Sequence, residues 1–154
     1  MDKADWKQDL QTCFEDLQVI DRCRVEAVAQ FDQFCDYIAE PAFEALTDEF
    51  SRYEIRCRSA WVKGVSIEFE IKFPRSKEDQ FHYILWLPKN AVELKIKLTL
   101  RGRKAPSVAL EEKTMAFLAK APAAEILRID KDALAQDVVA RYKKFLYETA
   151  VISE

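Results

Sequence analysis

The side chains that could act as acids, bases or nucleophiles are few in this sequence, and their neighbours do not favour catalysis. His82 is the only histidine of the 154 residues. The predicted strands place no serine or cysteine plainly beside it, so no nucleophile and base pair is indicated. The carboxylates Glu68, Glu70 and Glu93 fall among Lys and Arg on a predicted solvated surface. That setting is a poor one for acid-base work.

Cysteine, metal and nucleotide chemistry are not indicated either. The four cysteines are Cys13, Cys23, Cys35 and Cys57. None belongs to a C-x-x-C pair, and no histidine lies at zinc-ligand spacing. Cys13 and Cys35 fall on an apolar helix face and Cys57 on an inward strand position, so we expect buried, reduced thiols. The chain has only two glycines and no phosphate-binding glycine motif, so we expect no cofactor, no metal and no enzymatic activity.

Length and composition indicate one globular domain, residues 1–154. The chain is 49% hydrophobic and 33% charged, which suits a folded core with a charged surface. Two glycines and five prolines leave little room for linkers. The first residues lack the pattern of a signal peptide, and the apolar run YILWL is too short to span a bilayer. We therefore expect a cytoplasmic protein without a membrane segment.

The net charge of −3 conceals a split between segments of the chain. Residues 1–50 carry 13 acidic and 4 basic side chains, whereas residues 51–104 carry 13 basic and 6 acidic ones. Such asymmetry can mark a partner surface. The alternative is that an acidic helix and a basic sheet complement each other within one fold.

The first forty residues predict a long helix. A seam of residues recurs at alternating spacings of four and three: Trp6, Leu10, Cys13, Leu17, Ile20, Arg24, Ala27, Phe31, Phe34 and Ile38. This is the a/d pattern of a heptad, and neighbouring e positions are mostly apolar too. Glu40-Pro41 is expected to end this helix and open a shorter one that reaches residue 51.

The predicted helix is longer than the sheet that it must cover. An unbroken helix over residues 4–39 would run roughly 50 Å, against about 30 Å for a nine-residue strand. We expect it to overhang the sheet and to self-associate through Trp6, Leu10 and Arg24. One polar residue in an apolar seam, here Arg24, often fixes register or oligomeric state; the alternative is an arginine that simply extends into solvent.

Residues 53–101 predict a four-stranded antiparallel meander. Apolar and charged residues alternate over 53–61, 65–73 and 92–101, while 81–88 is apolar on both faces. Side-chain parity requires an odd Lys63-Gly64-Val65 loop or a bulge at Gly64. A two-residue Lys89-Asn90 turn would pair Leu85 with Leu94.

The remaining segments complete an α+β fold. Residues 103–129 are irregular or add a strand or helix, and Asp130 is expected to cap a C-terminal helix over residues 131–149. The predicted architecture is a long N-terminal helix, a short helix, the four-stranded meander and the C-terminal helix, with the helices packed on one face of the sheet.

Two surfaces could bind a partner. His82, Ile84 and Trp86 form an apolar stripe on the outer sheet face, which a protein partner, draped Lys and Glu side chains, or residues 103–129 could cover. In the predicted register Trp86 lies between Glu68 and Glu93. A basic set along the fourth strand could track a nucleic-acid backbone; it comprises Lys95, Lys97, Arg101, Arg103 and Lys104.

These observations favour a small, non-enzymatic protein-interaction module: an adaptor, an immunity-type or antitoxin-type inhibitor, or a chaperone-like binder. We expect a homodimer and a protein partner on the stripe. The alternative is a single-stranded nucleic-acid-binding protein, which shared Glu side chains on the basic face and the absence of an RNA-recognition motif disfavour.

Overall fold

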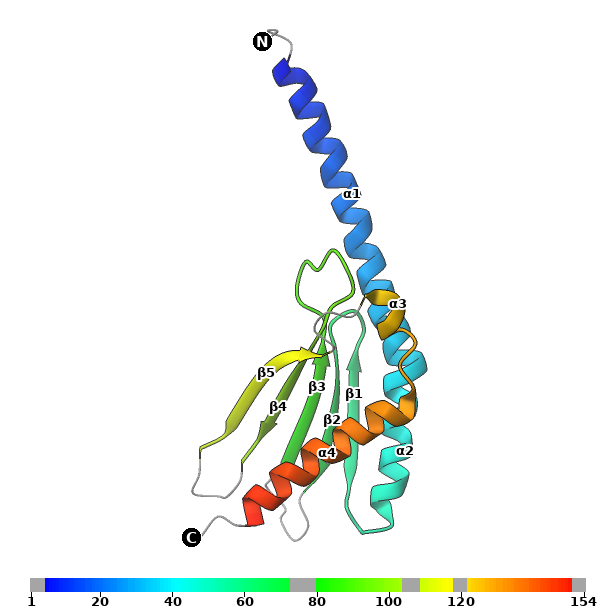
Figure 1. The fold of residues 1–154 in the computed structure, drawn as a ribbon, viewed down its shortest axis with the longest axis vertical. Coiled ribbons are helices and arrows are strands. Elements are labelled where there is room, and N and C mark those ends of the chain that lie inside the picture. Colours follow the sequence, from blue (N-terminus) through cyan, green and yellow to red (C-terminus); the bar gives the residue numbers. More distant parts are fainter. Residues whose placement is uncertain (1–4, 73–79, 104–108, 118–121, 151–154) are drawn as a thin grey trace.

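The computed structural model describes residues 5–72, 80–103, 109–117 and 122–150, and it has the predicted α+β architecture. Figure 1 shows an antiparallel sheet with helices packed on one face and with one helix projecting far beyond it. In chain order the elements are α1 (Asp5–Phe34), the π-helical turn η1 (Cys35–Ala39), α2 (Glu40–Ser51), β1 (Cys57–Val62), β2 (Ser66–Lys72), β3 (Gln80–Trp86), β4 (Ile96–Gly102), β5 (Glu111–Phe117), α3 (Ala123–Ile126) and α4 (Lys131–Ala150).

The sheet has five strands in the order β1-β2-β3-β4-β5, so the prediction of four strands was wrong by one. The added strand is β5, which pairs antiparallel with β4 at the edge of the sheet. It lies within the segment 103–129, for which the sequence left strand and helix open. Its residues, EEKTMAF, show little alternation of apolar and polar side chains, because an edge strand is more exposed than a central one.

The predicted helix break at Glu40-Pro41 is absent. The chain stays helical from Asp5 to Ser51, and the turn before Pro41 is π-helical, with the Glu40 N–H donating to the Cys35 carbonyl. Proline lacks an N–H and crowds the preceding turn. The wider i→i+5 turn accommodates this, as π-turns within α-helices commonly do.

The β1–β2 turn has the odd length that parity required. Val62 faces Ser66, so Lys63, Gly64 and Val65 form the loop, and this prediction is confirmed. Gly64 has φ +72°, a left-handed conformation that glycine adopts at little cost.

The predicted β3–β4 register was wrong. Leu85 faces Leu98 rather than Leu94, because β4 begins at Ile96 and a longer connection replaces the two-residue turn. Pro88 cannot donate to a strand ladder, and Asn90 has φ +63°, so this part of the chain leaves the sheet early. The shift is even, so inward residues still face inward.

The core lies between the inner sheet face and the helices. Phe43 of α2 stacks on Phe69 of β2 with ring centroids 4.8 Å apart, and Phe31 and Phe34 of α1 are fully buried. The C-terminal helix is present as predicted, and the Asp130 carboxylate caps it by accepting a bond from the Asp132 N–H at 3.0 Å.

The base of the long helix is fixed to the β1–β2 turn. The Asp32 carboxylate accepts a hydrogen bond from the Gly64 N–H at 2.6 Å. A Cβ placed on Gly64 would lie 3.0 Å from Cγ1 of Val28. The helix therefore approaches the turn as closely as a residue without a side chain allows.

Replacing Gly64 with Ala should lower the free energy of unfolding by about 1–3 kcal/mol, since the added methyl group meets Val28 and the backbone conformation becomes strained. Urea unfolding followed by circular dichroism measures this. Val62→Ala, at the end of β1 just before the turn, is the control: Val62 is 55% exposed, so the change should stay within about 0.5 kcal/mol of wild type. Equal effects of the two substitutions would contradict the close packing described here.

Candidate interaction surfaces

The first part of α1 stands away from the rest of the molecule. We call residues 5–26 the arm; Ala27 is the first buried residue of the helix. Figure 1 shows the arm extending past the end of the sheet, with no other described element beside most of its length. The overhang expected from the length of the seam is present. At 1.5 Å per residue the arm measures roughly 33 Å.

The exposed arm carries the apolar seam. Trp6 is 63% exposed and Leu10 49% exposed, although both are large apolar side chains. Leu17 of the seam and Phe14 beside it are also exposed; Val19 and Val25 are exposed as well but lie outside the seam. Arg24 lies 3.5 Å from the Asp21 carboxylate, one turn earlier in its own helix. Monomeric proteins rarely expose so long an apolar surface as this part of the seam.

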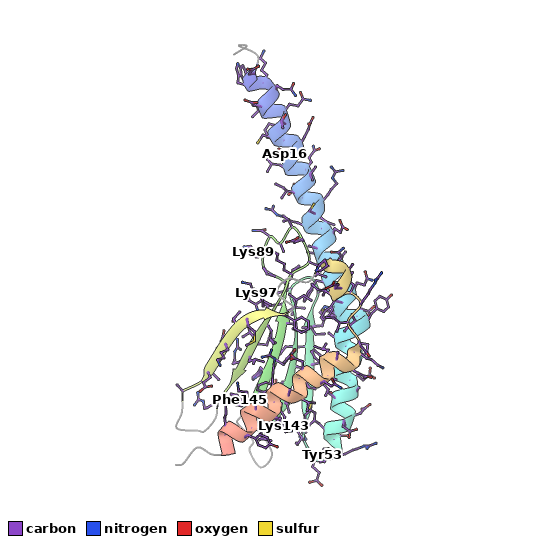
Figure 2. All side chains as sticks on the ribbon, in the orientation of Figure 1. Asp16, Tyr53, Lys89, Lys97, Lys143 and Phe145 are labelled. Carbon is purple, nitrogen blue, oxygen red and sulfur yellow. The ribbon has the colours of Figure 1, made fainter. Side chains whose placement is uncertain are left out.

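A groove opens where the arm meets the sheet. It has a volume of about 470 Å³. Its lining comes from the base of α1, the β1–β2 turn and the β3–β4 connection: Arg24, Val28, Gly64, Val65, Leu87 and Pro88, with Lys89 at the rim. Lys89 is labelled in Figure 2, on the loop that rises beside α1. The sequence did not reveal this groove, because it depends on the β3–β4 connection that was predicted as a tight turn.

The outer-face stripe is half-covered by its own neighbours. Trp86 lies between Ser66 and Lys97, not between Glu68 and Glu93 as predicted, because the register of both adjacent strands is shifted. The Trp86 indole N–H donates to Thr99 Oγ1 at 2.9 Å, and the Lys97 ammonium lies 5.5 Å from the indole centroid. The polar edge of Trp86 is thus already satisfied.

The other two stripe residues have similar cover. Ile84 lies between Glu68 and Thr99, and His82 lies between Glu70 and Arg101. The His82 Nδ1 lies 2.7 Å from a carboxylate oxygen of Glu68. Within residues 103–129, Glu111–Phe117 pairs at the sheet edge as β5, and Ala123–Ile126 forms α3, whose Ile126 is buried in the core. Partner binding through His82, Ile84 and Trp86 stays a prediction.

Thr99 connects the stripe to the sheet edge, since its hydroxyl also lies 3.0 Å from Thr114 Oγ1. Thr99→Val should lower the free energy of unfolding by about 1–2 kcal/mol, because it leaves the half-buried Trp86 N–H without an acceptor. Urea unfolding monitored by tryptophan emission checks this. Thr114→Val keeps the indole bond and should cost less; a larger loss there would contradict the assignment.

Two residues of the predicted basic set form ion pairs within the chain. Lys95 lies 3.1 Å from the Glu93 carboxylate, and Arg101 lies 3.3 Å from that of Glu112. Arg103 follows the end of β4, and Lys104 falls outside the described residues. The partner Glu112 was not identified from the sequence, because its strand was not.

A second concavity lies on the inner face, between α4 and the β4–β5 edge. Its volume is about 290 Å³, with an apolar floor that includes Leu100 and Met115 and a charged rim. Beside it the Tyr83 hydroxyl donates to Asp137 at 2.6 Å, and Arg141 Nε donates to the same carboxylate at 2.9 Å. Burial of the Tyr83 hydroxyl is the main cause that raises its pKa, and the hydrogen bond to Asp137 raises it further. Asp137 is therefore satisfied structurally by two donors.

The described residues contain no cluster of three or more His, Cys, Asp or Glu side chains that could hold a metal ion. Cys35 is buried as expected, and burial raises its pKa, with Asp32 and Glu40 adding to the effect. Cys13 is exposed, so its predicted burial was wrong: its helix face is apolar, but the arm extends beyond the core.

The thiols should differ in reactivity at pH 8. Burial raises the pKa of Cys57 from 9.0 to about 12, which lowers its thiolate fraction about a thousand-fold, a factor of ten per unit. Cys13 should react with a chromogenic disulfide first, the half-buried Cys57 far more slowly, and the buried Cys35 only on unfolding. Mass spectrometry of partly labelled protein checks the order; early labelling of Cys35 would contradict the burial.

Comparisons of the chain with protein-family models, with curated proteins and with solved structures give no match. Within the described part of the chain, no helix is both long enough and apolar enough to cross a membrane. The case for function therefore depends on the surfaces themselves.

Proposed function

We propose that this protein is a non-enzymatic protein-interaction module of the cytoplasm that self-associates through the arm. The observation that carries the proposal is the continuity of the seam. From Ala27 onward its members are buried, and before Ala27 residues of the same pattern are exposed, apart from the half-buried Ile20. The arm thus has the surface of a packed helix without a partner inside its own chain.

Burial of this surface would supply a substantial driving force. Each large apolar side chain that leaves water contributes about 1.5–3 kcal/mol. Trp6, Leu10, Phe14 and Leu17 are all about half exposed or more. Association must offset roughly 4–15 kcal/mol of lost freedom. The eight side chains of two arms supply a term of that order, whereas one isolated side chain does not.

The nucleic-acid alternative has less support. It needs cations that are available to phosphates, whereas Lys95 and Arg101 lie against carboxylates and Lys97 lies over Trp86. Binding of a single-stranded oligonucleotide that weakens steeply with salt would favour it over the proposal.

Sedimentation velocity of wild type should show a dimer at micromolar concentration, and Leu10→Glu should weaken it by at least ten-fold, because a charge then enters the apolar seam. Val19→Glu is the matched control, since Val19 is 48% exposed and Leu10 49%, but Val19 lies on the opposite side of the helix. Thermal unfolding of the two variants as monomers should be the same, since neither side chain packs on the core. A wild-type monomer up to millimolar concentration would overturn the proposal.

A further inference from the structure

We propose that two copies of this chain pair their arms antiparallel, so that Trp6 of each copy lies against Arg24 and enters the groove at the base of the other arm. This inference rests on the proposed self-association and specifies its geometry. It follows from the heptad positions of the exposed residues, from how far the arm extends before it meets the sheet, and from the location of the groove.

Charge disfavours a parallel pair. The spacing assigns Leu10, Leu17 and Arg24 to a positions, and Trp6, Cys13 and Ile20 to d positions. In a parallel dimer each residue meets its own copy, so Arg24 would face Arg24 within the seam. At the flanking positions, Asp16 (g) of each copy would face Asp21 (e) of the other copy, which gives two acidic pairs. Like charges in these positions are destabilising.

An antiparallel pair pairs a positions with d positions. Aligned so that Leu10 faces Ile20 of the second copy, the arms also place Leu17 against Cys13 and Arg24 against Trp6. A guanidinium over an indole is the favourable cation–π arrangement. The arginine that interrupts the apolar seam then has a partner inside it.

The flanking positions fit the same alignment. In an antiparallel pair, each e position faces an e position of the second copy. Lys7 therefore lies against Asp21 of the second copy, and the two Phe14 side chains lie against each other near the two-fold axis. One like-charge pair remains, Asp16 with its own copy; Figure 2 labels Asp16 midway along the arm. The alignment therefore replaces two acidic pairs and an Arg–Arg contact with a single acidic pair.

The dimensions of the arm select this alignment among the antiparallel ones. Sliding the helices together by one heptad would require Ala27 and Phe31 to face the partner, but both are buried in their own chain. Sliding them apart by one heptad would leave Ile20 and Arg24 unpaired. The selected overlap, residues 6–24, extends about 27 Å and uses the whole exposed seam.

The groove lies where the partner's Trp6 arrives. Arg24 and Val28 line it together with Val65, Leu87 and Pro88. These apolar side chains would surround the indole, and Lys89 at the rim would lie near the acidic first turn of the partner helix, which begins at Asp5. One copy thus supplies the tryptophan and the other supplies its site, twice in a two-fold dimer.

Disulfide trapping tests the orientation, with every variant in a Cys23→Ser background. The proposed alignment places position 17 opposite Cys13, so Leu17→Cys should give at least ten-fold more covalent dimer on oxidation than either control. One control is the background protein, in which Cys13 is the only thiol of the arm. The other combines Cys13→Ser with Leu17→Cys, so that the only thiol of the arm is the one introduced at position 17. A parallel pair would instead crosslink both controls, because each single thiol would then meet its own copy.

Val65→Arg tests the groove. It should weaken dimerisation by about ten-fold, whereas Val62→Arg should not: Val65 is 54% exposed and Val62 55%, but Val62 lies outside the groove. Equal effects would remove the groove from the proposal. A sedimenting dimer without the crosslink between positions 13 and 17, or with crosslinked controls, overturns the antiparallel arrangement but keeps self-association. A monomer at all concentrations overturns both, and then a different protein is the occupant of the arm.

Discussion

The contact between α1 and the β1–β2 turn determines where the arm stands. Asp32 and Val28 meet Gly64 there, and the two buried phenylalanines that follow, Phe31 and Phe34, attach the helix to the sheet. A helix is stabilised mainly by packing of its apolar face. Beyond this contact, among the described residues, the arm has its own backbone bonds and a few side-chain pairs within the helix, so its apolar face is the surface for which a partner matters most.

Much of the fold followed from local patterns in the sequence. The α+β class, the Asp130 cap and the odd loop around Gly64 were predictable, because each depends on neighbouring residues: a cap on one oxygen, a loop on strand parity. The β3–β4 register was not predictable. Pro88 and Asn90 change how many residues the connection holds, and a shift by an even number of residues leaves the apolar and polar faces of the strand unchanged. β5 was undecided for a related reason, as an edge strand shows little alternation.

The candidate sites show the same limit at the level of side chains. Periodicity identified the seam of Trp6, Leu10 and Arg24, but it did not show where the sheet stops covering that seam. That boundary is tertiary, and it reversed the prediction for Cys13 while confirming Cys35. The stripe residues were identified correctly as outward-facing, yet their cover comes from Thr99 and Lys97, which only the true register brings beside Trp86.

The π-helical turn has a consequence for how this chain tolerates insertions and deletions. It holds one residue more than an α-turn, and packed residues lie on both sides of it, with Phe34 before and Phe43 after. Losing one residue between Cys35 and Ala39 would convert this turn into an ordinary α-turn and leave both halves facing the sheet. Losing one residue from the α-helical turns on either side would instead rotate one half of the helix against the other by about 100°. The π-helical turn is therefore the place within the packed part of this helix where the chain can lose a residue and keep both halves on the core.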